Sequence, residues 1–176
     1  MAELSIKEKW IQGVALTTTI IAVCAALSTL RGGAFSTKVQ ISTTQESNKW
    51  SYFQSKSTKQ HICEVQLQAF EINELLTSNS VVIDTIDSKI SQLKKDIARY
   101  DKEKAEIKKE AEQLNVLQQE YKAHSGSFAI AAMLLQIAIM LSSVGALMKK
   151  KWMWFAGMAL GASGIVYMMN GFLLFF

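Results

Sequence analysis

Three uncharged apolar runs set the strongest limit on how this chain can fold. They are Trp10–Leu30, Phe128–Met148 and Trp152–Phe176, and none of them contains Asp, Glu, Lys or Arg. A helix needs about 20 apolar residues to cross a hydrocarbon core of about 30 Å, which is close to the length of each run. Because backbone groups in lipid find no water to bond, a crossing segment satisfies them internally as a helix. The sequence therefore predicts three transmembrane helices.

The stretch between the first and second runs has the pattern of paired helices. From Ile83 to Tyr121, positions spaced alternately three and four residues apart form one stripe, in which Lys104 and Gln118 are neither apolar nor aromatic. Such heptad spacing is typical of a long helix that packs one narrow stripe on another helix. The two polar residues either fix the register of the pair or face water where the partner helix ends.

The partner helix is expected just before this stripe. The hydroxyl and acidic residues at Ser42–Glu46 are typical of a helix start, and the hydroxyl and amide residues at Thr77–Ser80 are typical of a turn. We therefore expect the partner helix from about Thr44 to Leu76, antiparallel to the helix that carries the stripe. The chain has no proline, which fits long helices because a proline in a helix interior costs about 3 kcal/mol or more.

The predicted fold class is an all-α membrane protein, with three transmembrane helices and a long antiparallel, coiled-coil-like helical hairpin between the first and the second. Gly32 and Gly33 permit a bend where the chain leaves the membrane, and His124–Ser127 is a candidate joint before the second span. The predicted segments are a polar tail at 1–9, a transmembrane helix at 10–31, an extramembrane hairpin at 32–126, a transmembrane helix at 127–148, a basic turn at 149–151 and a transmembrane helix at 152–176.

The formal net charge of +4 reflects membrane topology rather than a nucleic-acid surface. Basic and acidic residues balance between Gly32 and Ser127, so the surplus lies at Arg31 and at Lys149–Lys151, beside the apolar runs. Lysine-rich loops favour the cytoplasmic side of a membrane. The triple lysine therefore predicts a cytoplasmic N-terminus and a hairpin on the outer side, although Arg31 favours the opposite orientation. Membrane lipid is an expected partner, and nucleic acid is not.

Two sets of residues are candidate packing sites. The glycines of the third span share one face and allow another helix to approach closely. Because three spans can serve this face only partly, and the hairpin stripe has one partner helix, we expect copies of the chain to cover the surplus by forming a homo-oligomer. The residues are Gly157, Gly161, Gly164 and Gly171 in the span, and Ile90, Leu93, Ile97 and Ile107 in the hairpin.

A short aromatic and basic string provides a candidate docking site. Its residues are Trp50, Tyr52, Lys56 and Lys59, which lie within three helical turns. They form either a docking surface for a protein partner or a lipid headgroup, or the aromatic root of the hairpin core with lysine stems that cover it.

No residue pattern predicts catalysis or a cofactor. His61, Cys63 and Glu64 are metal-ligand types, but residues two apart on a helix point to different faces, and no second cluster accompanies them. Cys24 lies in the first span, so it forms no disulfide framework with Cys63. The sequence has no phosphate-binding loop and no nucleophile elbow, and the spans carry no charge that could relay protons. We expect no enzyme activity, cofactor, metal site or catalytic residue.

The order of these segments, together with the motif W-x-Y-x-x-x-K-S-x-x-Q-H, resembles a known family. The motif follows the first span and precedes a charged helix and a two-span C-terminus, and its residues are Trp50, Tyr52, Lys56, Ser57, Gln60 and His61. Over nearly its whole length the chain is similar to the bacterial membrane-protein family called domain of unknown function four-three-three-seven. The resemblance implies a bacterial membrane protein, which we place in the cytoplasmic (inner) membrane, and it supplies no activity or site residue.

Three functions remain open from the sequence. The leading hypothesis is a homo-oligomeric structural or scaffold protein of the membrane with a protruding coiled-coil arm. The first alternative is an oligomeric pore or channel lined by Thr17, Thr18, Gln136 and Ser142. The second alternative is an accessory subunit that docks another protein through the arm.

Overall fold

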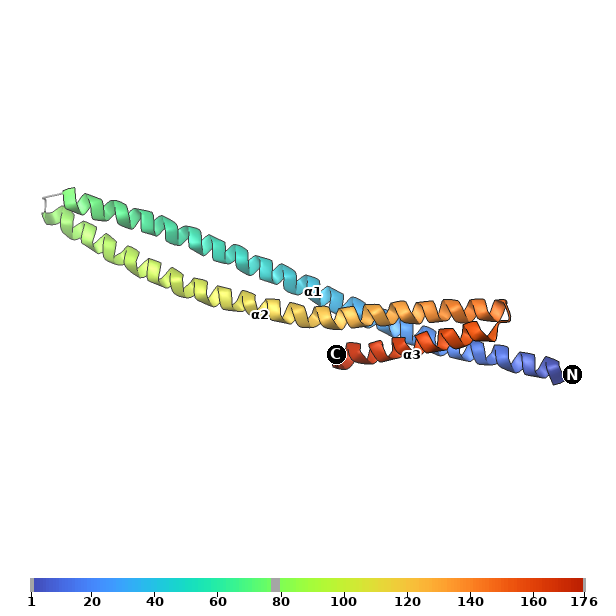
Figure 1. Ribbon diagram of the computed structural model, residues 1–176. Helices are drawn as coiled ribbons and strands as arrows, with labels where there is room; N and C mark the ends of the chain where they lie inside the picture. The colour runs from blue at the N-terminus through green and yellow to red at the C-terminus, as the bar shows by residue number, and fades with distance from the viewer. Residues whose placement is uncertain (1, 77–79, 176) are drawn as a thin grey trace. The chain divides into compact units, whose positions relative to one another are not determined.

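The computed structural model describes residues 2–76 and 80–175, which form three α-helices (Figure 1). These are α1 (Ala2–Leu76), α2 (Ser80–Leu147) and α3 (Lys151–Leu173). No strand occurs among the described residues, so the all-α class is confirmed. Each helix contains a segment that is long and apolar enough to cross a membrane. Except for Ser80, where α2 begins, the turn expected at Thr77–Ser80 lies outside the described residues.

Helices α1 and α2 continue through positions where bends were expected. Residues Gly32–Gly33 and His124–Ser127 are helical, and each glycine in a helix interior costs only about 1 kcal/mol relative to alanine. Gly32 instead allows α1 to lie close to α2, since a Cβ atom at this position would be 3.1 Å from the Cβ atom of Phe128. The transmembrane helices predicted at 10–31 and 127–148 are therefore parts of longer helices.

The chain divides into two compact units. The three-helix unit contains the residues up to Gln40 and those from Gln118 onward, and the two-helix unit is Ile41–Leu117. The hairpin expected at 32–126 is thus longer than the two-helix unit at both ends. Ring contacts of Phe35 with Tyr121 and His124, described below, explain why the flanking residues belong to the three-helix unit.

In the three-helix unit, large side chains of α2 fill the hollows left by glycines of α3. Phe128 and Leu135 are fully buried. A Cβ atom at Gly171 would lie 3.0 Å from the Phe128 ring, and one at Gly164 would lie 2.8 Å from Cγ of Leu135. The glycines therefore remove the bulk that would keep α3 away from α2, as small residues do at contacts between membrane helices.

Helix α1 packs on the same core from a second direction. Ile21 and Ala25 of α1 are buried together with Leu135 and Ala138 of α2. The end of the Ile21 side chain also covers Gly161 of α3, where a Cβ atom would be 2.9 Å from Ile21 Cδ1. All three helices thus meet at a core of aliphatic and small residues.

An aromatic cluster closes one end of the three-helix unit. Phe35 stacks on the His124 ring at 4.5 Å and on the Phe128 ring at 5.9 Å, and it lies 6.2 Å from the Tyr121 ring. Nδ1 of His124 is 2.8 Å from the backbone oxygen of Gly171, so a proton on Nδ1 is donated to α3. The cluster ties α1 and α3 to α2 and extends the unit beyond the apolar runs.

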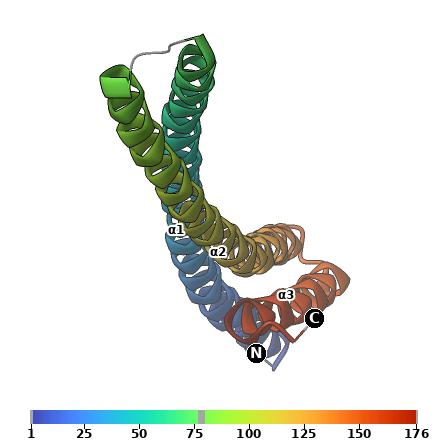
Figure 2. The same cartoon turned by 90° about the vertical axis from the view of Figure 1, so that its left-hand side faces the viewer.

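In the two-helix unit, α1 and α2 lie side by side (Figure 1 and Figure 2). Ile86, Ile90, Ile107 and Ala111 of the predicted stripe are buried. Contacts between the helices join rising residue numbers in α1 to falling numbers in α2, so the helices run antiparallel. Three of these polar contacts are Glu46–Asn115 at 3.3 Å, Lys56–Glu103 at 2.7 Å and Glu71–Lys94 at 3.4 Å.

We predict that Gly157→Ala destabilises the three-helix unit, whereas Gly33→Ala does not. A Cβ atom at Gly157 would be 2.9 Å from the backbone oxygen of Ala138, while one at Gly33 meets nothing within 4 Å. Overpacking of this kind costs about 1–3 kcal/mol. Thermal unfolding in detergent, followed by helical circular dichroism, measures the difference. Equal melting temperatures for the two variants would contradict this packing.

Candidate functional site

The glycine face expected to need a second copy is covered within the chain. Gly157, Gly161 and Gly164 are buried, as is Gly171. Their neighbours are Ser142, Ile21, Leu135 and Phe128, all from α1 or α2 of the same chain. The glycines pack helices as predicted, but the argument that this face requires another copy loses its physical basis. Their role in an oligomer therefore remains a prediction without support from an exposed surface.

The hairpin stripe is likewise turned toward its own partner helix. Ile90 and Ile107 are buried, and Leu93 and Ile97 are half-buried. The expected surplus of apolar stripe is therefore largely absent from this side of α2. A second copy, if it binds the two-helix unit, must contact a different face.

The four candidate docking residues separate in the structure. Trp50, Tyr52 and Lys59 are exposed, whereas Lys56 is half-buried. The Trp50 indole packs edge-on against the Phe53 ring at 5.7 Å, and its Nε1–H donates to Glu46 Oε1 at 3.4 Å. Lys56 is thus part of the contact between helices, whereas the other three side chains remain exposed.

Lys56 joins the two helices through a charge pair between tyrosine rings. Its Nζ atom is 2.7 Å from Glu103 Oε2 and lies 5.2 Å from the Tyr52 ring and 5.5 Å from the Tyr100 ring. The hydrogen bond to Glu103 raises the pKa of Lys56, and the same bond lowers the pKa of the Glu103 carboxyl group. This geometry stabilises both charged forms and gives Lys56 a structural role.

Lys104 and Gln118, the two polar residues of the stripe, do not face water, since the first is half-buried and the second is buried. Lys104 is half-buried, with its Nζ atom 5.9 Å from the centre of the Phe53 ring and 3.4 Å from Asp101 Oδ1. Gln118 is buried, and its Oε1 atom accepts a hydrogen bond from Lys122 at 3.4 Å. Of the two explanations given for these residues, exposure beyond the end of the partner helix does not apply.

The four residues considered as a pore lining differ in their surroundings, and Gln136 is the exposed one among them. Thr17 and Thr18 donate hydrogen bonds to backbone oxygens of their own helix, and Ser142 is fully buried beneath Gly157. Gln136 is exposed, and no hydrogen bond of its amide to another described residue is present. It borders a groove of about 500 Å³ between α1 and α2, lined also by the small residues Ser28, Gly32, Ala129 and Ala132.

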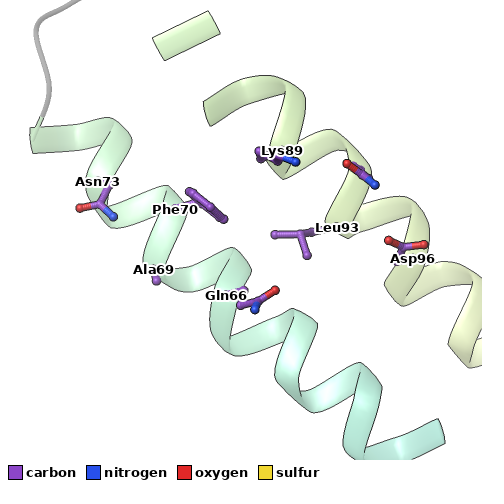
Figure 3. A pocket seen from close by; sticks show the side chains of 8 residues that line it. Gln66, Ala69, Phe70, Asn73, Lys89, Leu93 and Asp96 are labelled. Atoms are coloured by element: carbon purple, nitrogen blue, oxygen red, sulfur yellow. The ribbon is translucent and has the colours of Figure 1, made fainter. Parts of the chain in front are cut away.

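A second groove lies between α1 and α2 of the two-helix unit (Figure 3). Its volume is about 480 Å³. Phe70 and Leu93 point toward each other within it, and polar side chains form its rim. The rim residues are Gln66, Asn73, Lys89, Gln92 and Asp96. No sequence motif predicts this groove, because it depends on the spacing between two helices.

The described residues contain no group of three or more His, Cys, Asp or Glu side chains that could hold a metal ion. His61 lies 3.7 Å from Glu64, one helical turn away. Cys24 and Cys63 are free thiols, each half-buried. Cys24 packs against the core that includes Leu135 and Ala138 of α2.

Comparison with known proteins assigns the chain to a family. A family model described as Domain of unknown function (DUF4337) matches residues 10–174. The chain belongs to this family. The resemblance based on the Trp50 motif is thereby confirmed, and the DUF4337 match includes all three apolar segments and the two-helix unit. No curated protein and no solved structure matches the chain.

We predict that Glu103→Gln weakens the acid sensitivity of the two-helix unit. Because the native pKa of Glu103 is lowered, its charge stabilises the fold at neutral pH. That contribution is lost as the pH falls below about 4.3, the value of an unperturbed glutamate, and on through the native pKa. Unfolding midpoints measured from pH 7 to pH 3 should therefore fall less steeply in Glu103→Gln than in the parent protein.

Glu106→Gln is the matched control for this prediction. Glu106 is exposed on the same helix, so its substitution should leave the pH profile close to that of the parent. A Glu103→Gln profile as steep as the parent profile would show that the Lys56–Glu103 pair does not contribute to stability.

Proposed function

We propose that this chain is a homo-oligomeric structural protein of a bacterial cytoplasmic membrane, in which three helices cross the bilayer and the two-helix unit projects as a coiled-coil hairpin. The apolar segments of α1, α2 and α3 support the three crossings. The antiparallel contacts of the two-helix unit, such as the Lys56–Glu103 pair, support the hairpin. Its role is to organise the membrane around it or to hold neighbouring proteins at a fixed place.

The orientation in this proposal follows from the basic turn. Lys149 and Lys150 lie between α2 and α3, Lys151 begins α3, and basic residues between two membrane helices favour the cytoplasmic side. Two crossings earlier, the N-terminus is then also cytoplasmic, and the hairpin lies on the outer or periplasmic side. Arg31 is an opposing signal, and its guanidinium lies 5.7 Å from the centre of the Phe172 ring.

The exposed amide of Gln136 is the main observation that supports a homo-oligomer. It lies near the middle of the apolar segment of α2, where lipid offers no hydrogen-bond partner. Small residues line the groove beside it and allow another helix to approach closely. A second copy brings its own Gln136 amide, which can both donate and accept. Pairing of copies at this groove therefore satisfies a group that a single copy leaves unsatisfied.

The alternatives have less support. A pore needs polar side chains that face a shared path, but Thr17 and Thr18 bond to their own helix and Ser142 is buried. We propose no catalytic role, and the Lys56–Glu103 pair is an ion pair that joins the two helices. The rings of Trp50 and Tyr52 are exposed. They support docking of another protein as an additional role of the arm.

We predict that Gln136→Leu weakens association of copies in lipid by about 3- to 30-fold. This range corresponds to about 0.6–2 kcal/mol for a polar contact between membrane helices. Energy transfer between labelled copies in vesicles, measured as a function of protein-to-lipid ratio, gives the association constant. The control is Met133→Leu, which changes an apolar residue of the same groove and should leave association unchanged.

Two results would contradict this prediction in different ways. A parent protein that stays monomeric at every protein-to-lipid ratio would refute the oligomer. A parent oligomer that Gln136→Leu leaves intact would retain the oligomer but remove the Gln136 amide from its interface.

A further inference from the structure

The two helices of the two-helix unit expose faces of different chemistry. Between Ile41 and Leu76, all of which the structure describes, Lys59 and Glu71 are the only Asp, Glu, Lys or Arg residues among the exposed positions of α1. More than half of the exposed residues of α2 from 81 to 117 are charged. A helix whose outer face meets only water is expected to resemble α2. The near absence of charge on α1 therefore requires its own explanation.

The uncharged face of α1 contains an apolar stripe with heptad spacing. Ile62, Val65, Ile72 and Leu76 have exposed fractions of 51%, 52%, 58% and 78%. With Ala69 they follow the alternating spacing of three and four residues that allows a helix to pack along a narrow stripe. They lie opposite the face that packs on α2, since the half-buried or buried positions of α1 fall between them.

The stripe continues toward the N-terminal end of the unit with small and uncharged residues. At the same spacing, every position back to the start of the unit is exposed and lacks charge. We call the whole set the outer stripe of α1. Its residues are Ile41, Thr44, Asn48, Ser51, Ser55, Thr58, Ile62, Val65, Ala69, Ile72 and Leu76.

We propose that the outer stripe is a pairing surface for the outer stripe of a second copy of this chain, with the two α1 helices parallel and in register. The inference rests on the proposed function in one respect, namely that copies share a membrane. It goes further by naming the surface, the partner and the geometry of the contact outside the bilayer.

The charge pattern selects the partner. A helix that covers the outer stripe must itself present an uncharged face with heptad spacing, because burying an unpaired charge is costly. The outer face of α2 does not fit, since the equivalent positions include Lys95, Arg99 and Lys102. The outer stripe of another α1 fits, because it has the same spacing and no charge.

Attachment to one membrane fixes the direction of the pair. When two copies lie in the same membrane with the same orientation, α1 leaves the bilayer on the same side in both. Their α1 helices therefore run parallel. A two-fold axis along the membrane normal then places each residue of the outer stripe against the same residue of the other copy. Confinement to one membrane also raises the effective concentration of one stripe near the other.

The length of the stripe is sufficient for a stable contact. It extends over about five heptads, and with the flanking positions about 20 residues of each copy take part, close to the 20–30 per side of a stable interface. The serine and threonine half allows close approach of the backbones, and the aliphatic half supplies the apolar surface that is removed from water. Together these features suit a continuous helix pair.

Disulfide cross-linking of the full-length protein in lipid vesicles tests this proposal. With Cys24→Ala and Cys63→Ala in the background, single cysteines are placed on the outer stripe as Val65→Cys and Ile72→Cys. Matched controls on the outer face of α2 are Lys95→Cys and Lys102→Cys. In a parallel, in-register pair the cysteines of the outer stripe meet their own counterparts within disulfide distance. We expect a covalent dimer from each stripe variant, at a yield at least tenfold above that of the controls.

Energy transfer between copies, measured on the same vesicles, separates this proposal from the proposed function. Association without cross-linking at residues 65 and 72 would overturn the outer-stripe proposal and leave the homo-oligomer standing. Absence of both association and cross-linking would overturn both. Equal cross-linking yields on α1 and α2 would indicate random collision and would also overturn the outer-stripe proposal. The proposal would likewise be overturned if lipid or another polypeptide covered the stripe and prevented cross-linking between copies.

Discussion

A helix that packs against a single antiparallel neighbour buries one narrow stripe, and the rest of this structure follows from that limit. In the two-helix unit, Ile90 and Ile107 of α2 are buried in such a contact. The opposite faces remain outside, and their chemistry differs: α2 presents charges such as Lys95 and Lys102, whereas α1 presents the outer stripe. The inner contact therefore builds the unit, and the outer faces determine what it can bind.

In the three-helix unit, the contact between helices depends on glycines rather than on a heptad stripe. Gly157 and Gly164 let α3 approach α2 so closely that Leu135 is fully enclosed. With the glycine face satisfied inside one chain, it gives no reason for copies to associate. What remains is the amide of Gln136, which lies near the middle of an apolar segment and is exposed beside small residues. In our account, copies pair at this groove and along the outer stripe, and the two contacts support each other because both need parallel copies in one membrane.

The sequence predicted the helical class and the residues that pack, and it was less informative about what they pack against. The spacing of Ile83–Tyr121 identified the inner face of α2, and the glycines identified the packed face of α3. Periodicity shows which face of a helix is buried but not which helix buries it, so it could not show that the chain's own helices cover the whole glycine face. Continuity through Gly32–Gly33 was missed because a glycine signals a bend only when neighbouring packing allows one. The Phe35–His124 stack joins residues far apart in sequence and has no local signal.

Images of single particles of the full-length protein in lipid nanodiscs test the central claim most directly. That claim is that each chain fills its own inner contacts and leaves the outer stripe of α1 for a second copy. The account predicts a two-fold symmetric particle whose arm contains four helices, with the two α1 helices in the centre and the two α2 helices outside. A particle with one chain, or with several chains whose α1 outer stripes face water, would contradict it.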